Sequence, residues 1–197
     1  MGLGCITGQK EHGAADRMTD ELDVIRRVLD GDPESFQRLV DRYAGPVMRM
    51  IRNVTGDRHA CEDIAQEVFL AAYAKLRSFD PDRSRFSTWL FTIARNKSVN
   101  ALKKKKPLCV ADVPERTDGK GPEEAAAGGE LLAALDEALL GLPVDQRTAF
   151  VLAEFERLSY ETIAQIEGVR VGTVKSRINR ARNRLKEALN RFEVDTS

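Results

Sequence analysis

The stretch from Leu158 to Arg182 reads LSYETIAQIEGVRVGTVKSRINRAR, and it decides the fold of the carboxyl-terminal part of the chain. Ser159 is a typical N-cap residue for a helix that begins at Tyr160, and Gly168 supplies the residue that commonly ends a helix. A second helix is expected to begin near Val171. The small side chain of Ala164 suits a close helix crossing, so the spacing predicts a helix-turn-helix.

The second helix of this motif is strongly basic. Val174 and Ile178 lie four residues apart and predict its buried face, which leaves Lys175, Ser176, Asn179 and Arg180 on the outside. Residues 170–191 carry eight basic side chains and one acidic one. A lone run of charges is as often a solvated surface as a binding site, but the preceding helix-turn-helix pattern favours DNA in the major groove.

The residues before this motif extend the carboxyl-terminal domain and separate it from the rest of the chain. Leucines repeat at helical spacing from residue 131 to 142, and Pro143 is expected to open the next helix. Residues 107–130 contain three prolines, four glycines and a net charge of −4, which together predict a flexible linker. The carboxyl-terminal domain is therefore expected at 131–191, followed by a short tail at 192–197.

The amino-terminal half has a helical pattern from residue 20 to 106, with apolar residues three and four apart. The triplet 31–33, Gly-Asp-Pro, separates the first two helices, and the triplet 55–57, Thr-Gly-Asp, ends the second. A third helix is expected over 59–77, and a fourth begins near Ser87. Residues 1–19 show little periodicity and are interpreted as a disordered leader. The sequence predicts an all-α protein of two small helical domains joined by a flexible linker.

The composition excludes several classes of protein. No apolar run approaches the roughly 20 residues that a membrane-spanning helix needs. The three cysteines, Cys5, Cys61 and Cys109, form no disulfide framework or zinc-binding pair, which fits a reducing cytoplasm. With two histidines and no catalytic or metal-ligand spacing, we expect no enzyme activity, no metal site and no cofactor.

The quoted stretch resembles region four of bacterial sigma factors of the extracytoplasmic-function (ECF) group, a branch of the sigma-70 family. Two further stretches of the amino-terminal half agree with this resemblance. Residues 63–69, DIAQEVF, resemble the polymerase-binding helix of sigma region two, and residues 86–96, FSTWLFTIARN, resemble its promoter-melting helix. The resemblance covers residues 21–189 and implies a region-two domain at 20–106 and a region-four domain at 131–191.

One helical stripe is expected to bind core RNA polymerase. Its residues lie at positions i, i+3, i+4 and i+7, and they are Asp63, Gln66, Glu67 and Leu70. In the resembling family this face docks on the clamp-helix coiled coil of the largest subunit. Taken without the family, the two acidic residues could equally favour the first turns of their helix through its dipole.

The resemblance assigns promoter DNA to two other helices. In the family, the loop at 79–86 and the position of Asn96 capture a flipped base of the minus-ten element, so the site residues expected in this domain are Trp89, Arg95, Asn96, Lys97, Lys103 and Lys104. Trp89 remains open between core packing and a DNA role. For the minus-thirty-five element, the expected residues are Lys175, Ser176, Asn179 and Arg180 toward the bases, and Thr173 and Arg177 toward the backbone.

These expectations describe an alternative sigma factor that directs core RNA polymerase to promoters. The partners implied are core polymerase, through the clamp helices and the flap region, promoter DNA, and an anti-sigma factor, with no membrane insertion. Two other interpretations stay open: a free-standing helix-turn-helix regulator that binds an operator without polymerase, and a structural adaptor bound to polymerase.

Overall fold

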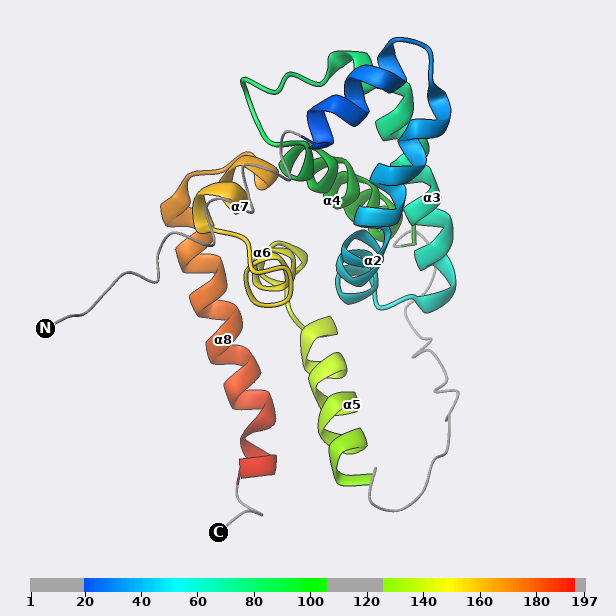
Figure 1. Cartoon of the computed structure of the whole chain (residues 1–197). Coiled ribbons are helices and arrows are strands. Elements are labelled where there is room, and N and C mark those ends of the chain that lie inside the picture. Colours follow the sequence, from blue (N-terminus) through cyan, green and yellow to red (C-terminus); the bar gives the residue numbers. More distant parts are fainter. Residues whose placement is uncertain (1–19, 106–125, 194–197) are drawn as a thin grey trace, which may run out of the picture.

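The structure is a computed structural model that describes residues 20–105 and 126–193, and all regular elements within these ranges are helical (Figure 1). A helical segment at 20–29 is followed by the short 3-10 helix η1 (Pro33–Ser35). The remaining elements are α2 (Phe36–Thr55), α3 (Arg58–Ala74), η2 (Leu76–Ser78), α4 (Phe86–Lys105), α5 (Ala126–Leu140), α6 (Val144–Glu154), α7 (Tyr160–Glu167) and α8 (Val171–Glu193). The prediction of an all-α fold is confirmed.

The first group of helices forms around α2, α3 and α4, each of which packs against the other two. The predicted helix ends are present. The side chain of Asp32 accepts a hydrogen bond from the backbone of Ser35, with Pro33 in the first turn, and Gly56 ends α2 with a left-handed φ of +71°. The side chains of Val47, Ile51 and Val68 are fully buried between these helices.

The third helix differs from its predicted range. It ends at Ala74 rather than near residue 77, and the chain continues through η2. The tighter 3-10 turn of η2 replaces the last turn predicted for α3. This turn carries Leu76, whose side chain is almost completely buried. The fourth helix begins at Phe86, one residue before the predicted start.

The second group of helices comprises α5 to α8. Helix α5 begins at Ala126, inside the range predicted as linker, because Ala126, Ala127 and the following leucines favour helix despite two intervening glycines. The leader at 1–19, residues 106–125 of the linker and residues 194–197 of the tail lie outside the described residues.

The helix-turn-helix forms as its sequence predicts. The hydroxyl of Ser159 accepts a hydrogen bond from the backbone N–H of Thr162 at 3.1 Å, which caps α7. Gly168 ends α7 with a φ of +66°, a conformation that favours glycine. Val174 and Ile178 are buried, so the opposite side of α8 faces solvent.

The two groups of helices also contact each other. Helix α4 packs against α7, and α2 packs against α5 and α6 (Figure 1). One hydrophobic cluster runs through both groups, joining Ile51 and Leu90 of the first to Leu152 and Ile163 of the second. The sequence pattern predicted two tethered domains and did not indicate this shared core.

Candidate polymerase and nucleic-acid interfaces

The predicted polymerase-binding stripe lies on the solvent side of α3. Asp57 caps the helix by accepting a hydrogen bond from the backbone of Ala60 at 2.9 Å. Ile64, Val68 and Ala72 turn into the core, and the four stripe residues, Asp63, Gln66, Glu67 and Leu70, are all exposed. Leu70 is 69% exposed, which is unusual for a leucine on a helix with a buried face. The stripe therefore offers carboxylates and an amide beside an apolar side chain.

Glu67 does not stand free on this surface. Its Oε2 accepts a hydrogen bond from Nζ of Lys97 at 2.7 Å, so one predicted polymerase contact is paired with one predicted DNA contact. The neighbouring Lys97, and more weakly Lys104, lower the pKa of the Glu67 carboxyl below its ordinary value. The pair is exposed, and exposed ion pairs contribute little stability.

Trp89 belongs to an aromatic cluster at the start of α4. Its ring centroid lies 5.5 Å from that of Phe79 and 5.7 Å from that of Phe86, and Phe86 also contacts Tyr43. The tryptophan is half-buried rather than enclosed. This arrangement supports packing against the loop before α4 and leaves part of the indole on the surface.

The remaining predicted residues of α4 form a mixed group. Asn96, Lys103 and Lys104 are exposed, and the half-buried Arg95 donates a hydrogen bond from Nη1 to Oδ1 of Asn96 at 3.2 Å. The Nη2 of Arg95 lies 3.8 Å from the Asp145 carboxylate of the second domain. The lysines extend along the same helix toward its end at Lys105.

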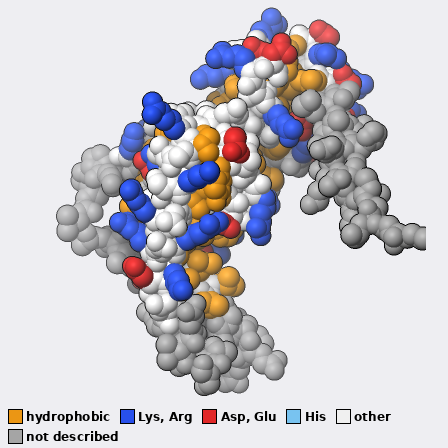
Figure 2. Space-filling model, turned by 90° about the vertical axis from the view of Figure 1, so that its left-hand side faces the viewer, with side chains coloured by type: hydrophobic (Ala, Val, Ile, Leu, Met, Phe, Trp, Pro, Cys, Tyr) orange, Lys and Arg blue, Asp and Glu red, His pale blue; other side chains and the backbone are white. Residues whose placement is uncertain are grey.

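The predicted DNA-reading residues of α8 share one exposed surface. Thr173, Lys175, Ser176, Asn179 and Arg180 are all exposed, and they lie within the first three turns of the helix. In Figure 2, which views this side of the molecule, basic side chains outnumber acidic ones along the helix. Such a surface matches the charge of a duplex.

Arg177 differs from its neighbours on α8. Its guanidinium donates to Glu167 of α7 at 2.5 Å and to Asp145 of α6 at 2.9 Å, so it ties three helices together. The Glu167 side chain has no exposed surface. Burial raises the pKa of the Glu167 carboxyl, and the hydrogen bond from Arg177 lowers it in part.

Sequence reasoning missed the acidic residues that face these cations. Asp145 lies between Arg95 and Arg177, and Glu156, just after α6, accepts hydrogen bonds from Arg49 of α2. Neither acidic residue belongs to a recognisable motif. Arg95 lies 50 residues before Asp145 in the sequence, and Arg49 lies 107 residues before Glu156. No local pattern could have revealed pairs at that separation.

Other kinds of site find no support in the described parts of the chain. Residues 20–105 and 126–193 contain no group of His, Cys, Asp or Glu side chains arranged to hold a metal ion. In the same ranges, no helix is long and apolar enough to cross a membrane.

The fold and these surfaces define a two-domain helical DNA-binding protein. Its second domain presents a basic helix-turn-helix, and its first presents an acidic stripe beside a basic helix. A helix-turn-helix alone does not distinguish a regulator from an initiation factor, so the first domain decides the class.

Comparison with known families settles that class. The family model described as Sigma-70 region 2 matches residues 39–107, and the model described as Sigma-70, region 4 matches residues 132–185. The chain belongs to the sigma-70 family of RNA polymerase sigma factors, in its ECF group.

Named sigma factors are similar to this chain across most of its length. It is 37% identical to the ECF RNA polymerase sigma factor SigW of Bacillus subtilis, over 84% of this chain and 94% of that protein. It is 38% identical to the RNA polymerase sigma-H factor of Pseudomonas aeruginosa, over 87% and 96%. It is 36% identical to the ECF RNA polymerase sigma-E factor of Escherichia coli, over 85% and 93%.

Solved structures show the same fold. CnrH, in complex with the cytosolic domain of CnrY, superposes with a TM-score of 0.67 at 28% identity over 85% of this chain and 95% of that chain. The sigma factor RpoE of Bartonella quintana, in complex with the anti-sigma factor NepR, superposes with a TM-score of 0.64 at 29% identity, over 80% and 98%.

The chain is accordingly an alternative sigma factor, a non-enzymatic initiation factor that binds core RNA polymerase and directs transcription from promoters. The free-standing regulator receives no support from these comparisons, nor does the structural adaptor.

Proposed function

We propose that this sigma factor docks on core polymerase through Asp63, Gln66, Glu67 and Leu70 of α3, with the clamp helices of the largest subunit as the receiving surface. One observation carries this proposal: all four side chains are exposed along one stripe while the opposite side of α3 is buried. The carboxylates suit a basic partner helix, and Leu70 supplies an apolar contact at the end of the stripe.

Promoter opening is assigned to α4 and the loop before it. The half-buried rings of Phe79 and Trp89, which pack against the buried Phe86, are proposed to receive an unstacked base of the minus-ten element. Stacking a base on an aromatic ring contributes about 1–3 kcal/mol. Arg95, Asn96, Lys97, Lys103 and Lys104 would follow the displaced strand along α4.

Recognition of the minus-thirty-five element is assigned to the first turns of α8. Lys175 and Arg180 can pair with guanine edges or phosphates, and Asn179 suits adenine. Ser176 lies between them, and Thr173 at the helix start suits a phosphate. Arg177 is held by two carboxylates, so its contribution to DNA binding is proposed to be indirect, through the position of α8.

The proposal extends to the polymerase flap region, an anti-sigma factor and the cellular compartment. Region four would meet the polymerase flap region while α8 binds DNA. An anti-sigma factor is proposed as the inhibitor, because both solved relatives named above are held by a second protein. Core polymerase and promoter DNA lie in the bacterial cytoplasm, which is the proposed site of action.

Run-off transcription with purified core polymerase tests these assignments. We expect Glu67→Lys to lose core binding and transcription together, because it places a positive charge against a basic partner. Lys175→Ala should bind core as wild type does and lose promoter-specific transcripts at limiting concentration. Glu62→Lys, an equally exposed charge reversal on α3 outside the stripe, is the matched control and should bind normally. If Glu67→Lys copurified with core as well as wild type does, the assignment of the stripe would be wrong.

A further inference from the structure

A series of side-chain contacts leads from the first helical segment of the chain to the aromatic rings beside α4. Glu21 lies in that segment, and its Oε1 accepts a hydrogen bond from the hydroxyl of Tyr43 on α2 at 2.5 Å. The ring centroid of Tyr43 lies 5.6 Å from that of Phe86. Phe86 in turn contacts Phe79 and Trp89, the two half-buried rings proposed to receive a base.

Glu21 is a buried acidic residue that is only 8% exposed. The oxygen that receives Tyr43 also accepts a hydrogen bond from Nη1 of Arg42 at 3.2 Å, and Nη2 of Arg42 donates to Asp20 at 2.6 Å. Removing a carboxylate from water is costly unless hydrogen bonds and an opposite charge compensate. An apolar side chain would fill the same place without that cost. What the carboxylate adds is a fixed direction for the Tyr43 hydroxyl.

The Tyr43 hydroxyl is a permanent donor at neutral pH. Burial raises the pKa of this hydroxyl, and the hydrogen bond to Glu21 raises it further. Arg42 and the side chain of Ser87, the second residue of α4, lower the same pKa in part. The net direction is upward, so the hydroxyl keeps its proton and its hydrogen bond to the carboxylate wherever the protein is active.

Phe86 joins this hydrogen-bonded group to the rings proposed to receive a base. It is 2% exposed, and a close-packed side chain of this size cannot move without displacing its neighbours. The ring of Tyr43 is tilted by 56° against that of Phe86, and Phe79 meets Phe86 at 86° in an edge contact. A displacement of Tyr43 would therefore pass through Phe86 to the half-buried rings.

We propose that Tyr43, held by Glu21, is a positioning residue for promoter opening. Through Phe86 it keeps the rings of Phe79 and Trp89 in the arrangement on which an unpaired minus-ten base stacks. Neither Tyr43 nor Glu21 touches the DNA in this account. The proposal rests on the proposed function for the role of the two half-buried rings, and it extends the promoter-opening site to α2 and to the helical segment before it.

Binding of a single-stranded minus-ten probe to the holoenzyme tests this positioning role. The probe carries the nontemplate minus-ten sequence of the promoter used for run-off transcription, and a second set of probes places one abasic site at each position in turn. With the wild-type chain bound to core polymerase, removal of the stacked base should lower the affinity about tenfold, within the range for stacking of a base on an aromatic ring. The ratio of the two affinities measures capture of that base.

Four variants separate the hydroxyl and its acceptor from the rest of the fold. Tyr43→Phe keeps the ring, and we expect it to bind the abasic probe as wild type does and the intact probe about threefold more weakly, an effect of the size of one lost hydrogen bond. Glu21→Leu should do the same. Glu21→Gln retains an acceptor oxygen and should keep the wild-type ratio. Tyr160→Phe removes a hydroxyl from the start of α7 and is the matched control, with an unchanged ratio.

The ratio distinguishes positioning from a loss of stability. A purely structural role would weaken both probes equally, and a smaller folded fraction cancels because the ratio compares two probes with one protein. A wild-type ratio in Tyr43→Phe would overturn the proposal and leave the base-receiving role of the two rings in place. If the wild-type holoenzyme bound every abasic probe as tightly as the intact one, the proposed function of the rings would itself be wrong, and the positioning role would be lost with it.

Discussion

The ammonium group of Lys97 lies 2.7 Å from a carboxylate oxygen of Glu67, which joins the proposed DNA-binding helix α4 to the proposed polymerase stripe on α3. A basic helix of the polymerase that approached Glu67 would compete with Lys97 for the same carboxylate. Lys97 would then be released toward the DNA strand. Because the pair is exposed, this exchange would cost little.

The pair predicts a measurable shift in the titration of Glu67. Since Lys97 lowers the pKa of this carboxyl in the folded chain, its stabilising contribution is present above the unfolded pKa and is lost as pH falls through the folded pKa. Carbon NMR of the Glu67 carboxyl should therefore show a midpoint below the ordinary glutamate value. Lys97→Met should raise the midpoint, and the distant Lys186→Met should not. An unchanged midpoint in Lys97→Met would show that the pair does not form in solution.

Arg177 and Arg180 should respond differently to substitution although they lie on one helix. Arg180 is exposed. Arg180→Ala should either reduce the slope of log affinity against log salt concentration by about 1, if Arg180 contacts a phosphate, or relax the base preference, if it contacts a base. Arg177→Ala should leave the salt slope unchanged and lower the stability of the helix-turn-helix, because Glu167 would be left buried without its partner. Affinity measured against salt concentration, beside urea unfolding, separates the two. A reduced slope in Arg177→Ala would instead identify a direct phosphate contact.

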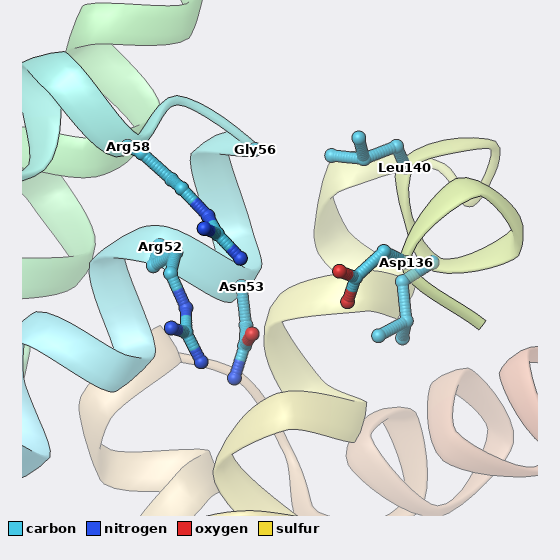
Figure 3. A pocket seen from close by; sticks show the side chains of 7 residues that line it. Arg52, Asn53, Gly56, Arg58, Asp136 and Leu140 are labelled. Carbon is cyan, nitrogen blue, oxygen red and sulfur yellow. The ribbon is translucent and has the colours of Figure 1, made fainter. Parts of the chain in front are cut away.

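Substitution of two glycines that share a backbone conformation should have different consequences. Gly56 and Gly168 have φ values of +71° and +66°, so Gly56→Ala and Gly168→Ala should each lower the free energy of unfolding by about 1–2 kcal/mol. Only Gly56 meets Leu140 of the other domain (Figure 3), whereas nothing lies within 4 Å of a Cβ at Gly168. Gly56→Ala should therefore also broaden the distribution of distances between spin labels attached at residues 38 of α2 and 186 of α8, measured by pulsed electron paramagnetic resonance. Equal behaviour of both variants in that measurement would contradict the contact.

Trp89→Leu should separate packing from promoter opening. Leucine retains apolar contact with Phe79 and Phe86 but offers no ring on which a base can stack. Permanganate footprinting of the Trp89→Leu complex should show less melting of the minus-ten region, with core binding unchanged. Loss of thermal stability with normal melting would assign Trp89 to packing alone.

Local sequence signals predicted most of the helical framework. Ser159, Gly168 and Asp32 act at the helix ends where their side chains or conformations predict, and the buried positions of α3 and α8 follow the helical period. The end of α3 and the start of α5 were misplaced because a buried Leu76 and an alanine-rich segment outweighed the turn signals.

The contacts between domains could not be predicted in this way. Arg49 and Glu156 are separated by 107 residues, and each looks like an ordinary surface charge in its own helix or turn. Their pairing depends on how α2 and α6 pack, which is a property of the whole fold. The sequence likewise gives no sign of the two carboxylate partners of Arg177, which lie on α6 and α7.

Association with core polymerase is the most direct test of the account. The purified full chain, without any inhibitor, is mixed with bacterial core enzyme at low salt, and complex formation is followed by size-exclusion chromatography and by fluorescence of labelled protein. The account predicts a stable complex that Glu67→Lys weakens and Glu62→Lys leaves intact. Failure of the wild-type chain to bind core under these conditions would contradict it.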